Sequence, residues 1–177
     1  MNRISPSLFS LPADQLAPLL IGKLLCRRIS DRILRYRIIE TECYMGEEDS
    51  ACHAHRSKTQ RNAPLYFSGG HSYVYLCYGI HHLLNIVSGP KDHPEAVLIR
   101  GVEGYSGPGR LTKALQIDRS LNAIDLISSD ELWLEEDGVS LSYTTTPRIG
   151  IDYAKPCDRD RLWRFAALDP TKQQKNR

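Results

Sequence analysis

The stretch LLCRRISDRILRYRIIETECY, residues 24–44, decides the fold. Residues 24–29 and 33–41 are rich in aliphatic side chains, and the polar pair Ser30-Asp31 separates them. Runs of this length that are bounded by turn residues are typical of β-strands. The stretch therefore predicts two strands that follow each other across a turn.

Most of the remaining chain has the same pattern of short elements. Strands are predicted, from apolar or alternating runs, at residues 71–78, 83–87, 96–102, around 133, at 149–151 and at 162–166. Helices are predicted from Ser10 to just before Gly22, around 49–52, and over 110–117. Many strands with few helices predict an α+β fold, in which a mostly antiparallel, curved sheet is flanked by short helices.

The size and composition fit one globular domain. The chain has 177 residues, of which 41% are hydrophobic and 25% are charged. We expect residues 1–171 to form one domain with a buried core, and the polar tail 172–177 to be disordered. No apolar run is long enough to cross a bilayer, and the first residues lack a signal-peptide core. These features predict a cytoplasmic protein with no membrane contact and with reduced cysteines.

The charge is unevenly distributed, although the net charge is only +2. Residues 53–91 contain no Asp or Glu but include four Lys or Arg residues, whereas residues 125–137 contain six acids and no Lys or Arg. A basic surface beside an acidic one suits contact of one face with nucleic-acid phosphates. Charge alone is equally compatible with random placement.

The segment Glu40-Thr41-Glu42-Cys43-Tyr44 is the densest group of chemically active side chains. In a strand Glu40, Glu42 and Tyr44 share one face, because successive side chains alternate. Two acids and a tyrosine on one face suit the floor of a cleft. The same alternation also fits a strand at the edge of a sheet with its polar face in solvent, and periodicity does not separate the two interpretations.

Five aromatic residues lie close together between basic residues, namely Tyr66, Phe67, Tyr73, Tyr75 and Tyr78. Aromatic rings among cations suit the stacking of bases and the binding of phosphates, but tyrosines also favour the interior of a sheet. Tyr78 precedes Gly79 at an expected turn, where a tyrosine can project as a wedge into a DNA groove.

Two further segments indicate contacts with a phosphate backbone. They are residues 59–62 and the glycine-rich stretch 106–113, which opens a helix. Their candidate DNA-binding residues are Arg61, Asn62, Arg110 and Lys113. Histidines 53, 55, 81 and 82 could be metal ligands in a hydrolase, but the chain has no C-x-x-C and no H-E-x-x-H motif. No metal site is therefore predicted.

Taken together, these segments resemble the alkyladenine (3-methyladenine) DNA glycosylase family. The matching pieces lie in order between residues 16 and 165, at residues 40–44, 49–53, 59–62, 73–81, 85, 97–100 and 107–111. The order and spacing of the pieces carry the resemblance more than any single piece. The sequence departs from the family pattern at Cys43, His55 and Gln60, and in the highly charged stretch 152–161.

The resemblance implies a role for each matching residue. Glu42 would be the general base that activates water, and Arg100 would help to hold that water. The pocket for the flipped base would be formed by Tyr44, Ala51, His53, Tyr75 and Asn85, with Asn85 disfavouring guanine. Tyr78 would fill the gap left in the duplex.

The expected protein is a monofunctional glycosylase that acts as a monomer on double-stranded DNA containing a damaged purine, and that needs no cofactor. Two alternatives remain at this point. A non-catalytic nucleic-acid-binding module would use the same aromatic and basic face without needing Glu42. A metal-dependent hydrolase would use the histidines and would lose its activity in EDTA.

Overall fold

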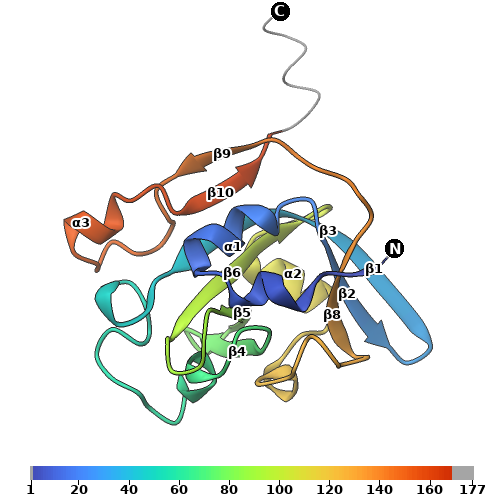
Figure 1. Cartoon of the computed structure of the whole chain (residues 1–177), viewed down its shortest axis with the longest axis horizontal. Helices are drawn as coiled ribbons and strands as arrows, with labels where there is room; N and C mark the ends of the chain where they lie inside the picture. The colour runs from blue at the N-terminus through green and yellow to red at the C-terminus, as the bar shows by residue number, and fades with distance from the viewer. Residues whose placement is uncertain (1, 169–177) are drawn as a thin grey trace, which may run out of the picture.

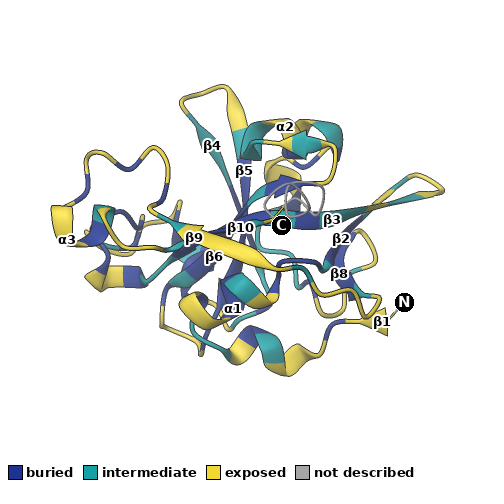
Figure 2. Ribbon diagram, turned by 90° about the horizontal axis from the view of Figure 1, so that it is seen from above, coloured by how far each residue is buried: buried dark blue, intermediate teal, exposed yellow. Residues whose placement is uncertain are grey.

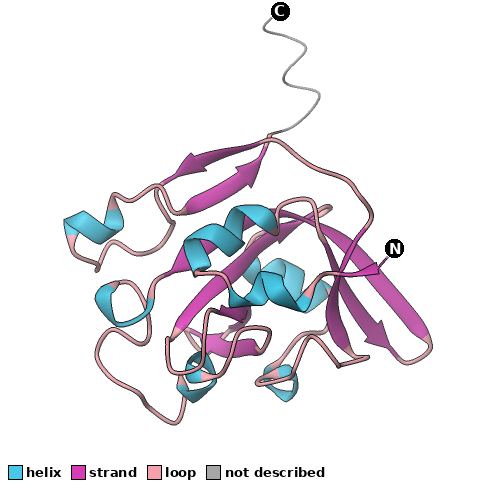
Figure 3. Ribbon diagram, in the orientation of Figure 1, coloured by secondary structure: helices cyan, strands magenta, loops and turns pink. Residues whose placement is uncertain are grey.

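The computed structural model describes residues 2–168, and one curled antiparallel sheet of ten strands dominates it (Figures 1 and 3). The strands are β1 (Asn2–Arg3), β2 (Leu24–Ile29), β3 (Arg32–Tyr44), β4 (Ser72–Cys77), β5 (His81–Ser88), β6 (Glu95–Val102), β7 (Tyr105–Ser106), β8 (Leu132–Glu136), β9 (Tyr143–Thr146) and β10 (Arg164–Ala167). The expected disordered tail 172–177 and the last residues of the expected domain, 169–171, lie outside the described residues.

The sheet is organised around the long strand β3. The strand order is β1-β8-β2-β3-β6-β5-β4, while β10 pairs with β3 and β9, and β7 pairs with β6. The first half of β3 pairs with β2 across the turn at Ser30, whose φ of 52° is left-handed. The second half of β3 pairs with two strands, β6 and β10. Residues 40–42, which include both candidate acids, therefore lie where three strands meet.

An irregularity in pairing marks this junction. The register between β3 and β6 shifts between Ile38 and Glu40 and again between Glu40 and Thr41, so that Arg100 falls in the shifted stretch. Such bulges bend a strand and redirect its side chains, and they are frequent beside active sites. The shift allows Arg100 to approach the acids of β3.

Short helices cover the sheet and complete the core. They are α1 (Ala13–Leu19), α2 (Pro108–Ala114) and α3 (Pro156–Arg159), with 3₁₀ turns at Pro6–Ser10, Gly46–Glu48, Ala63–Tyr66 and Arg119–Leu121. Helix α1 buries Leu16 and Ala17 against strands β3, β5 and β6, and α2 buries Leu111 against β5 and β6 (Figure 1). This packing confirms the α+β fold and the mostly antiparallel sheet with short helices.

Three predicted elements are wrong in detail. Residues 149–151 are a loop, and the strand in this part of the chain is β9, at Tyr143–Thr146. The helix expected around 49–52 is a turn, because Asp49 accepts from the backbone N–H groups of Met45 and Ala51. The first α-helix begins after Pro12 and not at Ser10, since residues 6–10 form a separate 3₁₀ turn.

The hairpins β2–β3 and β4–β5 project from the body of the sheet, and the tip of β4–β5 is exposed (Figure 2). Tyr78 and Gly79 occupy this tip with φ values of 49° and 71°, as the expected turn requires. Within residues 2–168, no helix is long and apolar enough to cross a membrane.

Candidate active site

Glu42 lies at the centre of a group of polar contacts at the end of β3. Its carboxylate has no exposed surface. Oε1 accepts from the backbone N–H of Ile149 at 2.8 Å and lies 3.4 Å from Nη1 of Arg100, and Oε2 accepts from the Tyr44 hydroxyl at 2.9 Å. Burial raises the pKa of Glu42, while Arg100, the Ile149 N–H and Tyr44 offset part of this increase.

A large open cavity, of about 1240 Å³, lies directly beside this carboxylate. Tyr44, Arg100 and Ile149 line the cavity, and each of them contacts Glu42. Glu42 is therefore one layer behind the cavity wall, and Tyr44, Arg100 and Ile149 stand between its carboxylate and the cavity. Strand β3 is not a solvent-facing edge strand, because its second half pairs with both β6 and β10.

The charged residues that line the cavity all carry positive charge. Among the described residues these are Arg56, Arg61, Arg100 and Lys155. A concave, positively charged surface attracts anionic ligands and raises their local concentration. The cavity therefore suits a ligand that carries negative charge.

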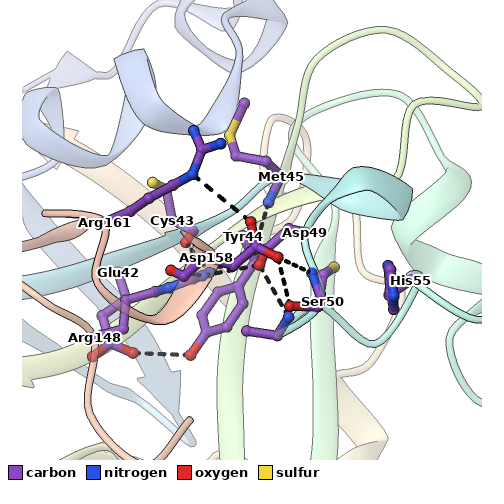
Figure 4. A network of polar contacts seen from close by, with 12 residues as sticks. Glu42, Cys43, Tyr44, Met45, Asp49, Ser50, His55, Arg148, Asp158 and Arg161 are labelled. Atoms are coloured by element: carbon purple, nitrogen blue, oxygen red, sulfur yellow. Dashed lines mark hydrogen bonds and ion pairs between the residues drawn. The ribbon is translucent and has the colours of Figure 1, made fainter. Parts of the chain in front are cut away.

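A buried ion pair fixes one wall of the cavity (Figure 4). The guanidinium of Arg148 donates to both carboxylate oxygens of Asp49, and also to the carbonyls of Cys43 and Asp158. The carboxylate of Asp158 in turn accepts from the backbone N–H and the hydroxyl of Ser50. These contacts join the segment 147–158 to the segment 43–50. They hold the Ile149 N–H against Glu42.

Arg148 also supports the ring of Tyr44. Its guanidinium carbon lies 4.7 Å from the centroid of the Tyr44 ring and 5.0 Å from that of Trp163. Because one side of Tyr44 is packed in this way, the ring keeps a fixed orientation at the cavity wall.

A second aromatic wall is formed by the segment around His53 and by strand β4. The His53 ring lies edge-on to Tyr75, with centroids 4.5 Å apart, and its Nδ1 is 2.9 Å from the Tyr73 hydroxyl. Tyr73 and Tyr75 are stacked on the same face of β4, as alternation predicts. Burial and the nearby Arg61 lower the pKa of His53, which favours the neutral form of its ring. His55 instead contacts the carbonyl of Glu47.

The cavity also contains polar groups that can meet the edge of a planar ligand. Asn85 is buried, and its amide donates to the Tyr73 carbonyl at 3.2 Å. The carbonyl of Ala51 accepts from the hydroxyl of Tyr153, whose side chain is 69% exposed at the mouth. Ala51 and Asn85, which the family resemblance assigns to the base pocket, both line the cavity.

Four of the five residues expected to contact DNA are exposed. Tyr78 is 88% exposed at the hairpin tip and borders the same cavity. Arg61 is exposed over the Tyr75 ring, at 5.4 Å from its centroid. Arg110 and Lys113 are exposed on α2. These positions leave all four side chains accessible to a large ligand.

Asn62 differs from the other candidates because it is only 3% exposed. Its side chain donates to the carbonyls of His53 and Ser57 and accepts from the N–H of Thr59. The Asn62 side chain therefore holds the loop that follows His53, and it is not free to contact DNA directly.

Several residues of the site were missed by sequence reasoning, namely Arg148, Ile149, Tyr153 and Lys155. They come from the stretch 147–155, in which no motif stands out. The contact between Arg148 and Asp49 spans 99 residues of sequence, so a single sequence carries no local signal of it.

The part of the chain that the structure describes contains no group of three or more His, Cys, Asp or Glu side chains arranged to hold a metal ion.

Comparison with known proteins identifies the family. The model of the methylpurine-DNA glycosylase family matches residues 7–171. The chain belongs to the methylpurine-DNA glycosylase family. Its relatives include a protein of Psychrobacter cryohalolentis that is 46% identical over 85% of each chain, and one of Borreliella afzelii that is 46% identical over 86% of this chain and 89% of the relative. A protein of Methanocella arvoryzae is 40% identical over 87% of this chain and 86% of the relative.

All three relatives carry the name "Putative 3-methyladenine DNA glycosylase". The match confirms the family that the ordered motifs indicate. It covers the cavity, the hairpin and the segment 147–158, so the whole candidate site lies within the region shared with this glycosylase family.

Proposed function

We propose that this protein excises damaged purines from double-stranded DNA by hydrolysing the N-glycosidic bond, and leaves an abasic site. The observation that carries the proposal is the position of Glu42, a buried carboxylate behind a cationic, aromatic cavity. Membership of the methylpurine-DNA glycosylase family supports the same reaction class.

The cavity suits a base that has been rotated out of the duplex. A purine inside the stack cannot be reached by an enzyme, and its extrusion costs a few kcal/mol. Tyr44, His53 and Tyr75 provide rings at the cavity wall against which the extruded base stacks. Tyr78, at the exposed hairpin tip, enters the duplex and fills the space that the base leaves.

Glu42 acts as the general base for the attacking water. The carboxylate takes a proton from the water, whose oxygen forms a bond with C1′ as the C1′–N bond breaks. The electrons of that bond leave with the base, through an oxocarbenium-like transition state that the negative carboxylate stabilises. General-base catalysis of this kind contributes about 10²- to 10⁴-fold.

Arg100 and the backbone at Ile149 position the reacting groups. Arg100 contacts Glu42 and lines the cavity, so its remaining N–H groups can donate to the water. Because burial raises the pKa of Glu42, we expect the rate to fall on acidification at a pH above the ordinary range for glutamate. Only the deprotonated carboxylate accepts the proton.

The substrates we propose are 3-methyladenine, 7-methylguanine, hypoxanthine and ethenoadenine. Cationic alkylated purines gain attraction to the aromatic rings and leave as neutral bases. The neutral lesions must be selected by shape and by hydrogen bonds, for which the Ala51 backbone and the Asn85 amide are available. We further propose that the protein acts as a monomer in the cytoplasm, on chromosomal DNA.

The test is base release from a duplex oligonucleotide that carries a single hypoxanthine or ethenoadenine. Alkali converts each abasic site into a strand break, and every reaction is run both with and without EDTA. Wild type should produce breaks, and Glu42→Gln should produce none while still binding the lesion duplex. Glu48→Gln, at an exposed glutamate outside the cavity, serves as the matched control and should behave like wild type.

The outcomes separate the three interpretations. Excision by Glu42→Gln within tenfold of wild type would remove Glu42 from its role. Lesion binding without strand breaks in wild type would favour a non-catalytic binding module. Strand breaks that disappear in EDTA would favour the metal-dependent hydrolase.

A further inference from the structure

Four alternating charges form a row beneath the cavity. Arg100 lies between two acids, with its Nε 3.0 Å from Oε1 of Glu40 and its Nη1 3.4 Å from Oε1 of Glu42. The same Oε1 of Glu40 also accepts from Nε of Arg164 at 2.6 Å. The order is therefore Glu42, Arg100, Glu40, Arg164.

The row connects three strands and is largely removed from solvent. Glu40 and Glu42 belong to β3, Arg100 to β6 and Arg164 to β10. The side chains of Glu40, Arg100 and Arg164 are 11%, 14% and 21% exposed. Charges at such sites interact more strongly than charges on an open surface, because solvent screens them less.

The contacts of Arg100 are unequal. Its closer carboxylate is Glu40, at 3.0 Å in a direct hydrogen bond, and Glu42 is farther away. If Glu40 did not hold Arg100, the guanidinium would be free to form a closer pair with Glu42. A carboxylate engaged in such a pair is a weaker base.

We infer that Glu40 is a positioning residue, which holds Arg100 in the register-shifted part of β6 and restrains it from neutralising Glu42. This inference rests on the proposed function, because Glu40 would act through the activation of water by Glu42. Arg164 has the opposite effect, because it binds the same carboxylate oxygen of Glu40 as Arg100 does and so weakens the attraction between Glu40 and Arg100.

The sign of the effect follows from all the groups that face Glu42. Arg100 of β6, the hydroxyl of Tyr44 and the N–H of Ile149 contact it directly, and Arg148 of the segment after β9 adds positive charge nearby. Each of these groups lowers the pKa of Glu42, and Glu40 is the acid that shares the Arg100 guanidinium with it. Removing the charge of Glu40 should therefore lower the pKa of Glu42. Removing the charge of Arg164 should raise it.

The plateau rate of excision separates the inference from a purely structural role. The Glu40–Arg164 pair also ties β10 to β3. If that tie were the whole function of Glu40, then Glu40→Gln and Arg164→Gln would break the same ion pair and would change the plateau rate alike. Under the inference only Glu40→Gln lowers the plateau rate, while the two variants shift the titration of Glu42 in opposite directions.

The experiment measures the pKa of Glu42 in the full-length protein by ¹³C NMR of its carboxyl group, assigned by the loss of its signal in Glu42→Gln. Glu40→Gln should lower this pKa by about one unit, the lower end of the shifts that close charges produce. Arg164→Gln should raise it. Arg35→Gln breaks another Arg–Glu pair of β3, at 2.8 Å from Glu135, and should leave the titration unchanged.

Single-turnover excision of hypoxanthine, measured against pH, provides the second readout. In Glu40→Gln the acid limb should move to lower pH, and the plateau rate should fall at least tenfold because Arg100 is no longer held. In Arg164→Gln the acid limb should move to higher pH. Shifts in the same direction, or no shift in either variant, would overturn the inference.

The two proposals can fail independently. If wild type releases no base, the proposed function fails, while the NMR titration still decides whether Glu40 controls the basicity of Glu42. If Glu40→Gln does not fold, the direction of the shift in Arg164→Gln decides the matter. A pKa of Glu42 that is unchanged or lowered in Arg164→Gln contradicts the inference.

Discussion

Replacing Arg148 with glutamine tests whether one buried ion pair holds the wall of the cavity beside Glu42. The Arg148 side chain is fully enclosed and contacts both oxygens of Asp49. Glutamine is shorter and uncharged, so it cannot donate to the same four acceptors. Among the described residues, the variant therefore leaves the buried Asp49 carboxylate with only the N–H groups of Met45 and Ala51 as partners.

The expected loss of stability follows from this unpaired, buried charge of Asp49. Removing one partner of a buried ion pair typically costs about 3–5 kcal/mol, most of which is the penalty of leaving the other charge unpaired. For a protein of this size, each kcal/mol lowers the melting temperature by about 2–4 °C. We therefore expect Arg148→Gln to melt at least about 6 °C below wild type.

Urea unfolding followed by circular dichroism measures the change in the free energy of unfolding. Arg159→Gln is the matched control, because its pair with Asp160 is largely exposed and should contribute little to stability. The double variant Asp49→Asn/Arg148→Gln should lose less than the sum of the two single variants, since the unpaired charge is absent. A loss below about 1 kcal/mol in Arg148→Gln would refute the reasoning.

Three further predictions concern recognition of DNA. Tyr78→Ser should weaken binding to a lesion duplex and reduce the fluorescence of a reporter base opposite the lesion, whereas Tyr143→Ser, on the distant strand β9, should change neither. Asn85→Ser should create room beside the Tyr73 carbonyl and permit release of guanine, and guanine release that stays undetectable would show that Asn85 is not the filter. Arg110→Gln and Lys113→Gln, at exposed positions on α2, should each reduce the slope of log affinity against log salt by about 1. Equal slopes in variant and wild type would exclude phosphate contacts at these positions.

The strands of the central sheet could be predicted because their sequence pattern is local. Residues 24–29 match β2 at both ends, and the runs at 71–78, 83–87 and 96–102 fall within one or two residues of β4, β5 and β6. Each of these strands buries one or both faces, so its apolar residues recur with the period of a strand. The turn at Tyr78-Gly79 could also be predicted from the local sequence.

The segment 149–151 shows where local patterns mislead. Its two isoleucines resemble a short strand, yet Ile149 is half exposed, and its N–H group binds Glu42 instead of a neighbouring strand. Ile151 is buried against Ala51 and Ala154. The apolar side chains of this segment are explained by a contact with the distant segment 43–51, for which a single sequence gives no signal.

The candidate site was predictable to the extent that its residues form local motifs. Glu42 and Tyr44 share a face of one strand, and Tyr73 and Tyr75 share a face of another, so alternation alone places each pair together. The segment from Arg148 to Lys155 reaches the cavity only through tertiary contacts. The buried role of Asn62 was also hidden, because the polar sequence around it does not show that its amide is satisfied by backbone groups.

The contacts of the segment 147–158 make stability and catalytic geometry difficult to separate in this protein. Arg148 fixes this segment through Asp49, and the next residue, Ile149, supplies the N–H group that binds the Glu42 carboxylate. A change that loosens the ion pair therefore also moves a partner of Glu42. The hairpin that carries Tyr78 also borders the cavity but shares none of these contacts within residues 2–168. Substitutions at the hairpin tip should therefore affect DNA binding without loss of stability, whereas substitutions in the segment 147–158 should affect stability and the rate of base release together.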